Sequence, residues 1–226
     1  MALFDHQSGS GDAATRALSV TAVESDFVAR VYQNMANVYD YTFGPVLHHG
    51  REQALERMAI RPGHEVLEVG VGTGISFDLY PRHCNVMGID VSSKMLDKAR
   101  ERILAQGLHH CGVQEMNAEA LDYPDNAFDA VYAPYVISVV PDPVKVAREM
   151  YRVCRPGGRV VILNHFRSSN VIGASLERAI SPMTVHLGFK ADLDLQGFLA
   201  QADLDPISIE KVNLPRIWTL VTVIKH

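Results

Sequence analysis

A glycine-rich turn between a strand pattern and a helix pattern constrains this chain more than any other stretch. Residues 66–69 form a short, mainly apolar strand pattern, Gly70, Gly72 and Gly74 follow at alternate positions, and a helical pattern continues through Leu79. Glycine allows a tight turn and leaves no Cβ atom between the backbone and a neighbouring group. A strand, a turn and a helix in this order begin a βαβ unit, which predicts parallel strands.

Strand and helix patterns alternate along the rest of the chain. This alternation predicts right-handed crossovers with helices on both faces of the sheet, and two final strand-like runs predict a terminal β-hairpin. The fold class is therefore α/β, a doubly wound and mostly parallel seven-stranded sheet. A turn is expected at residues 155–158, Arg-Pro-Gly-Gly. The expected strands are 66–69, 85–89, 111–116, 128–132, 159–163, 207–212 and 218–224, and the expected helices are 92–105, 142–154, 173–180 and 195–202.

The first part of the chain has a different pattern. Apolar residues between positions 20 and 38 recur at steps of three and four, which is typical of amphipathic helices, and a further helix is expected from Pro45 to Met58. The sequence predicts an N-terminal helical segment over residues 1–60 and a folded domain over residues 61–226. The segment is interpreted as a lid on the domain or as a contact with a membrane surface.

The composition excludes several classes of protein. Of the 226 residues 47% are hydrophobic, and the net charge of -5 is too acidic for binding nucleic acid through the overall field. The three cysteines are scattered and the ten histidines show no HxH or HxxxH spacing, so no metal site is expected. No run reaches the ~18 apolar residues of a transmembrane helix and no signal-peptide pattern is present, which predicts a cytoplasmic protein.

The spacing of the glycines narrows the choice of ligand. The turn reads GxGxG, whereas a dinucleotide site uses GxGxxG, so an NAD-dependent oxidoreductase is disfavoured. The second expected strand ends in Asp90, where a ribose diol can donate to the carboxylate. Ligands of doubly wound sheets bind at the carboxyl ends of the strands where the strand order reverses.

These motifs, over Gly63 to His165, resemble the class I S-adenosylmethionine-dependent methyltransferases. The resemblance implies their Rossmann-like fold, S-adenosyl-L-methionine as cofactor and S-adenosyl-L-homocysteine as product. Many relatives have Asp at the position of Asn117, which can still form hydrogen bonds. The cofactor-binding residues that the resemblance implies are Glu68, Gly70, Gly72, Gly74, Asp90, Val91, Met95, Asn117, Ala118, Glu119 and Ala133.

Two flanking stretches bear on the methyl acceptor. Residues 32–41, which contain YxxxAxxYD, and residues 163–166, Leu-Asn-His-Phe, resemble the bacterial soluble-type phosphatidylethanolamine N-methyltransferases. The quinone-ring C-methyltransferases share the first motif. The expected reaction is transfer of methyl groups to phosphatidylethanolamine, in one or more rounds toward phosphatidylcholine. The alternatives are C- or O-methylation of a quinone precursor or another small molecule, and a cofactor-binding module without catalysis.

The charge distribution agrees with a lipid substrate. Residues 145–178 contain seven basic and two acidic residues, a local excess of +5. Such a face can contact anionic headgroups, which predicts peripheral association with the inner face of the membrane, although a solvated helix face accounts for residues 145–155 equally well. Arg167 and Arg178 are candidates for the lipid phosphate, because arginine binds phosphate bidentately.

The acceptor also defines what the catalytic residues must do. An ethanolamine ammonium has no free lone pair, so a nearby imidazole, phenol or carboxylate must accept its proton before methyl transfer. Candidates at the expected edge of the site are Tyr39, Tyr41, Tyr135 and His165. We expect Tyr39 and Tyr41 to close over the cofactor and Tyr135 and His165 to orient the amine.

Overall fold

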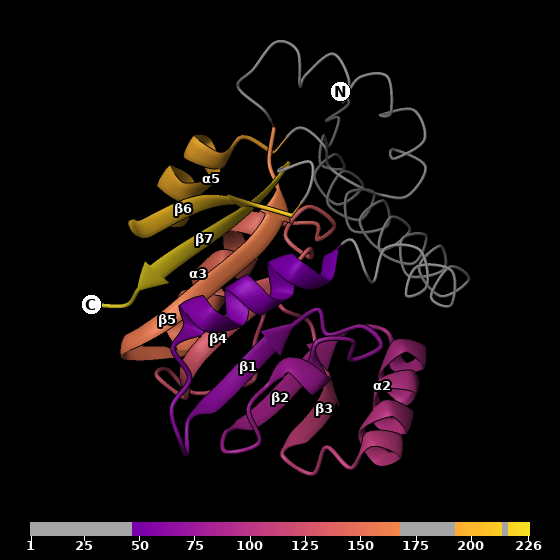
Figure 1. Cartoon of the computed structure of the whole chain (residues 1–226). Coiled ribbons are helices and arrows are strands. Elements are labelled where there is room, and N and C mark those ends of the chain that lie inside the picture. The colour runs from indigo at the N-terminus through magenta and orange to yellow at the C-terminus, as the bar shows by residue number, and fades with distance from the viewer. Residues whose placement is uncertain (1–46, 168–192, 214–216) are drawn as a thin grey trace, which may run out of the picture.

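The computed structural model describes residues 47–167, 193–213 and 217–226. In these ranges the strands form one seven-stranded sheet of order β3-β2-β1-β4-β5-β7-β6 (Figure 1), as the sequence predicts. The strands are β1 Glu65–Val69, β2 Asn85–Asp90, β3 Cys111–Glu115, β4 Phe128–Pro134, β5 Cys154–His165, β6 Pro206–Val212 and β7 Trp218–Ile224. The helices are α2 Ser93–Gln106, α3 Pro143–Val153, α5 Leu195–Ala202, the short 3-10 helix η1 Phe77–Leu79, and a helix over residues 47–58.

The strand order reverses between β1 and β4. From β1 the chain moves outward through β2 to β3, and it then returns to the other side of β1 to form β4 and β5, all in parallel. The predicted terminal hairpin is confirmed, because β7 pairs antiparallel with both β5 and β6. A ligand crevice is therefore expected at the carboxyl ends of β1 and β4.

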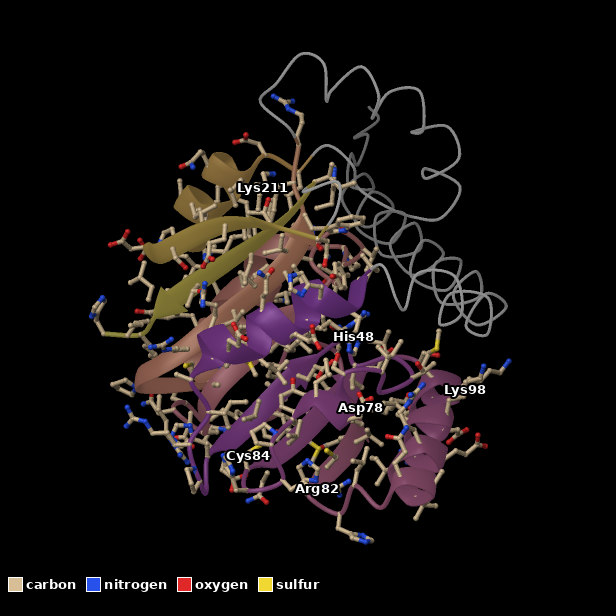
Figure 2. The ribbon with its side chains drawn as sticks, in the orientation of Figure 1. His48, Asp78, Arg82, Cys84, Lys98 and Lys211 are labelled. Atoms are coloured by element: carbon tan, nitrogen blue, oxygen red, sulfur yellow. The ribbon has the colours of Figure 1, made fainter. Side chains whose placement is uncertain are left out.

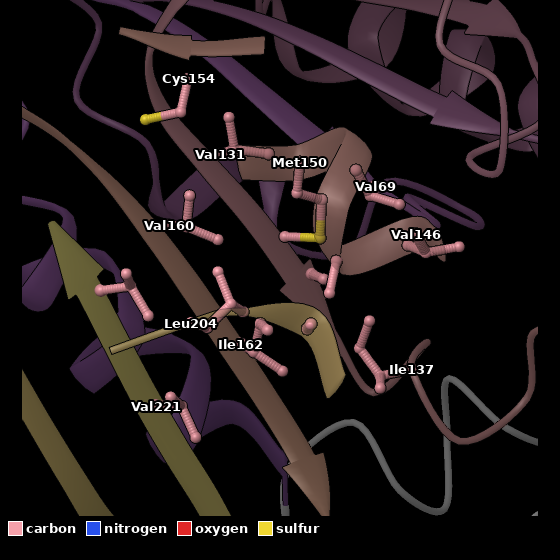
Figure 3. Close-up of a cluster of buried hydrophobic side chains, with 14 of the residues drawn as sticks. Val69, Val131, Ile137, Val146, Met150, Cys154, Val160, Ile162, Leu204 and Val221 are labelled. Atoms are coloured by element: carbon pink, nitrogen blue, oxygen red, sulfur yellow. The ribbon is translucent and has the colours of Figure 1, made fainter. Parts of the chain in front are cut away.

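Alternate residues of each strand face two separate cores. Ala130 and Tyr132 of β4 face the core under helix 47–58 and α2, whereas Val131 and Ala133 face the core under α3 and α5. In Figure 1 the helix of residues 47–58 crosses in front of the sheet and α3 lies behind it. Figure 3 shows the second core, which includes Val69, Val131, Ile137, Val146, Met150, Cys154, Val160, Ile162, Leu204 and Val221.

Two local expectations are wrong. The helix expected after the glycine turn is only η1, because Gly74 has a φ of 72° and Pro81 lacks the amide that a longer helix would need. The turn expected at residues 155–158 lies within β5, and the pairing register shifts there between Phe128 and Ala130 of β4. The helix expected at residues 173–180 lies outside the described residues.

The connection from β3 to β4 contains no helix, and α3 holds it in place. Arg152 of α3 donates to the carbonyl oxygens of Leu121 and Tyr123 at 2.9 and 2.8 Å and to the Asp125 carboxylate at 2.8 Å. Glu149, one turn earlier, accepts from the amide of Leu121 at 2.8 Å. These bonds replace the backbone bonds that a helix would have supplied, so the connection is fixed without regular structure.

Candidate active site

The three glycines of the turn serve different purposes. Gly70, Gly72 and Gly74 all have positive φ values, 69°, 56° and 72°, which residues with a Cβ atom rarely adopt. A Cβ atom on Gly70 would overlap Val136, and one on Gly74 would lie 2.7 Å from Phe77. Among the residues that the structure describes, none lies within 4 Å of a Cβ atom on Gly72. Gly70 and Gly74 are therefore required by packing, whereas the described part of the chain leaves the space above Gly72 open to a ligand.

Asp90 joins the turn to the end of β2. Its carboxylate accepts from the amide of Gly72 at 3.0 Å and from the amide of Ser92 at 2.9 Å. Burial raises the pKa of Asp90, although both amides favour its charged form. The next residue, Val91, is 62% exposed, whereas Met95 is buried in the first turn of α2. The structure thus brings Gly72, Asp90 and Val91 together at the carboxyl edge and places Met95 in the core.

The segment expected to face the adenine lies beside Asp90. The amide of Met116 donates to the carbonyl of Asp90 at 3.0 Å, so Asn117, Ala118 and Glu119 follow directly. The Asn117 side chain accepts from the amide of Glu119 at 2.9 Å, and the Glu119 carboxylate accepts from the amide of Asp142 at 3.1 Å. Both side chains therefore shape the segment in this structure.

Glu68 lies under the glycine turn. Its carboxylate is buried on the helix 47–58 side of the sheet and accepts from the Tyr80 hydroxyl at 2.7 Å. Burial raises the pKa of Glu68 to about 7, and Arg51 opposes this shift by favouring the charged form. Glu68 thus supports the turn from below, and the sequence motif alone did not indicate Tyr80 as its partner.

Tyr135 connects three elements. Its backbone has a φ of 60°, and its amide donates to the carbonyl of Leu163 in β5. Its hydroxyl donates to the carbonyl of Leu47 at 3.0 Å and accepts from the Asn213 side chain at 2.9 Å. Asn213 in turn accepts from the amide of Gly50 at 2.6 Å. The phenol of Tyr135 is thus bonded to helix 47–58 and to the end of β6.

His165 ends β5 beside a buried amide. The His165 side chain is buried, and its carbonyl accepts from the Asn164 side chain at 2.7 Å. The Asn164 side-chain oxygen also accepts from the amide and the hydroxyl of Ser138, both at 3.3 Å. These bonds fix the loop after β4 relative to His165. Arg167 is exposed two residues later, and Tyr39, Tyr41 and Arg178 lie outside the described residues.

Sequence analysis missed Arg51 and Asn213. Arg51 lies on the buried stripe of helix 47–58, at the helical spacing of Leu47, Ala54 and Met58, and is only 6% exposed. An arginine on an apolar stripe was the signal that could have identified it. Asn213 had no local signal, because its partners are far away in the sequence.

These residues fit the cofactor that the motifs imply. The open face of Gly72, the Asp90 carboxylate and the exposed Val91 provide close backbone approach, an acceptor for a ribose diol and an apolar surface for a base. Among the residues that the structure describes, no group of His, Cys, Asp and Glu has the arrangement of a metal site.

The glycines provide a matched pair of variants. Gly72→Ala and Gly74→Ala impose similar backbone strain, about 1 kcal/mol, because both positions have positive φ. We expect Gly74→Ala to lower the melting temperature further, since its Cβ atom clashes with Phe77. We expect Gly72→Ala to weaken S-adenosylhomocysteine binding with the smaller loss of stability, measured by calorimetry and thermal unfolding. Equal losses of stability in the two variants would contradict the assigned roles.

Glu68 predicts a pH dependence of stability. Its pKa is raised from 4.5 to about 7 on folding, so the folded state retains a proton that the unfolded chain has already lost between these values. The free energy of unfolding should therefore fall by about 3 kcal/mol as pH rises through this window. Urea unfolding should show this slope in the wild type and not in Glu68→Gln.

Glu210→Gln is the control for that measurement. Its ion pair with Arg57 lowers the pKa of Glu210, so the variant should differ from the wild type in slope only at more acidic pH. A Glu68→Gln protein that retains the wild-type slope would show that Glu68 is not the titrating group.

Comparison with known proteins shows the family of this chain. A model described as a methyltransferase domain matches residues 67–162. A phosphatidylethanolamine N-methyltransferase of Cereibacter sphaeroides is 41% identical over 88% of this chain and 98% of its own length. A ubiquinone/menaquinone biosynthesis C-methyltransferase of Pseudoalteromonas translucida is 33% identical over 67% of this chain and 65% of its own length.

A solved structure supports the fold. Phosphoethanolamine N-methyltransferase 2 of Haemonchus contortus, in complex with S-adenosyl-L-methionine, has a TM-score of 0.72 and 18% identity over 89% of this chain and 60% of its own. At this identity the match bears on the fold alone. The nearly full-length match to the Cereibacter sphaeroides protein goes further, and the chain belongs to the phosphatidylethanolamine N-methyltransferase family.

Proposed function

We propose that this protein transfers methyl groups from S-adenosyl-L-methionine to the amine of phosphatidylethanolamine, in successive rounds toward phosphatidylcholine. The observation that carries the proposal is the 41% identity to a phosphatidylethanolamine N-methyltransferase over 98% of that relative. The match to the quinone-ring enzyme covers 67% of this chain at 33% identity. Methylation of a quinone precursor is therefore the second candidate.

The cofactor site in this proposal is the carboxyl edge around the turn. The Gly72 backbone gives close approach, Asp90 accepts from the ribose hydroxyls, and Val91 packs against the base. Residues 117–119 line the base from the side of β3. Ala133, buried in β4, lies beneath the methyl-bearing end of the cofactor, and its side chain is too short to contact that end. The bound cofactor supplies an electrophilic methyl group on a sulfonium.

The protein must remove a proton from the ammonium group of the substrate and orient the resulting amine. His165, at the end of β5, is the proposed acceptor of the ammonium proton at an imidazole nitrogen, directly or through one water. The Tyr135 hydroxyl is bonded to Leu47 and Asn213, so we assign Tyr135 to positioning the loop that follows β4. Tyr39 and Tyr41 are proposed to close over the site.

Contact with the membrane is the third element of the proposal. In the described part of the chain no helix is long and apolar enough to cross a bilayer. Peripheral association with the inner face of the membrane is proposed instead, with Arg167 and Arg178 on the lipid phosphate and residues 1–60 as lid or membrane contact.

Much of the basic stretch has partners within the protein. Arg148 donates to the carbonyl of Gln201, Arg155 to the Asp129 carboxylate and Arg159 to the carbonyl of Arg57, and Arg152 holds the β3–β4 connection. These bonds favour a structural role for the four arginines. The proposed membrane contact therefore relies on Lys145, which is exposed, and on the cations beyond β5.

The acceptor can be identified directly. Protein incubated with methyl-labelled S-adenosylmethionine and mixed-lipid vesicles should place label in mono-, di- or trimethylated ethanolamine lipid, separated by chromatography. The distribution of label gives the number of rounds. A parallel reaction with a demethylated quinone precursor should remain unlabelled. Label in the quinone alone would replace the lipid assignment with the second candidate.

The role of His165 predicts a selective kinetic defect. His165→Ala should reduce kcat with phosphatidylethanolamine by about 100-fold, the lower end of general base catalysis, while S-adenosylhomocysteine affinity changes little. His109→Ala, an exposed histidine before β3, is the control and should retain full turnover. Unchanged kcat in His165→Ala would remove His165 from the mechanism.

A further inference from the structure

Arg51 is a buried cation whose hydrogen-bond donors are only partly satisfied by the residues that the structure describes. Its side chain is 6% exposed on the inner stripe of helix 47–58, near the start of which Figure 2 labels His48. Within the part of the chain that the structure describes, Nε and Nη1 of Arg51 are buried and have no hydrogen-bond partner. A guanidinium remains charged in proteins and carries five N–H donors, so leaving it unpaired in a core is costly.

The described groups around Arg51 do not satisfy all of its hydrogen-bond donors. The guanidinium carbon lies 5.0 Å from the centre of the Tyr135 ring, an arrangement that stabilises a cation from one side without satisfying its donors. Glu68 is near enough for Arg51 to favour its charged form, yet the Glu68 carboxylate accepts from Tyr80. Donors on two sides of the guanidinium, at Nε and Nη1, are therefore left without an acceptor among these groups.

The position of Arg51 associates it with the cofactor turn. Tyr135, which it contacts, follows the carboxyl end of β4, and the side chain of the next residue, Val136, packs directly against Gly70. Glu68 is the last residue but one of β1 before that glycine. Arg51 thus lies at the same reversal point of the sheet as the turn, on the face covered by helix 47–58.

We propose that Arg51 is an oxyanion-binding residue of the active site, whose guanidinium holds a carboxylate or phosphate of a bound ligand. Two sources have this chemistry. One is the amino-acid carboxylate of the cofactor, and the other is the phosphate of the lipid headgroup. Only the second source depends on the lipid acceptor proposed above, because binding of cofactor products can be measured without any acceptor.

The first arm of the experiment compares two ligands, of which only one carries the carboxylate. S-adenosylhomocysteine carries the amino-acid carboxylate, and methylthioadenosine retains the nucleoside and the sulfur without it. In titration calorimetry, Arg51→Gln should weaken the binding of S-adenosylhomocysteine by about 10- to 100-fold. The affinity for methylthioadenosine should stay within about 2-fold of the wild-type value. Arg51→Lys should recover part of the loss, since lysine retains the charge but not the geometry of the guanidinium donors.

Arg57→Gln is the matched control. Arg57 lies on the same helix, and its side chain is paired with Glu210 at 2.7 Å, with 40% exposure. The same chemical change there should leave both affinities unaltered. Equal weakening of both ligands in Arg51→Gln would overturn the proposal, because it would reflect disruption of the helix rather than loss of an anion contact.

The second arm tests the lipid phosphate. If both affinities are unchanged in Arg51→Gln, a rise in KM for phosphatidylethanolamine of about 10-fold or more identifies the phosphate as the bound oxyanion. An unchanged KM in Arg51→Gln, with both affinities also unchanged, overturns the proposal. If the wild type does not turn over the lipid, unchanged affinities for the two ligands alone overturn it.

Stability of the free protein separates binding from a structural role. Arg51→Met replaces the buried cation with an apolar chain of similar length. Its melting temperature without ligand should equal or exceed that of the wild type, while the increase caused by S-adenosylhomocysteine should shrink. A lower melting temperature without ligand, with the ligand-induced increase intact, would mean that Arg51 serves the core alone and would overturn the proposal.

Discussion

The arrangement of the active edge depends on one carboxylate between two backbone amides. Asp90 accepts from Gly72 and from Ser92, so the end of β2, the glycine turn and the start of α2 are held by a single side chain. The turn is also bonded through the backbone, because the amides of Gly70 and Val71 donate to the carbonyl of Ile89. The ligand surface is thereby formed by elements that support one another before any ligand arrives.

A second set of bonds defines the opposite wall. Tyr135, Asn213 and Gly50 link the end of β4, the end of β6 and helix 47–58 in one chain of hydrogen bonds. On the far side of the sheet, Arg152 and Glu149 of α3 fix the connection that follows residues 117–119. The connection after residues 117–119 is thus held by polar side chains from a regular element, which gives positional accuracy without regular structure.

The sequence predicted well the elements whose residues follow a local hydrophobic period. The strands, the helices α2, α3 and α5 and the terminal hairpin followed from the alternation of strand and helix patterns, and the order of motifs along the chain predicted which edge of the sheet binds the cofactor. It failed at residues 75–80, where tight backbone geometry overrides the helical pattern, and at residues 155–158, where a bulge keeps the chain in the sheet. The Tyr80 contact of Glu68 and the Asn213 contact of Tyr135 join residues distant in sequence, so no local pattern reports them.

The left-handed backbone of Tyr135 has a consequence for how the site can move. A tyrosine retains this conformation only while its surroundings enforce it, and here the constraint includes a bond from its hydroxyl to the carbonyl of Leu47. A glycine at this position would relax the backbone but would sever that bond. Helix 47–58 and the carboxyl end of β4 are therefore coupled through this bond, so a displacement of the helix would have to change the backbone torsion of Tyr135 or break the bond.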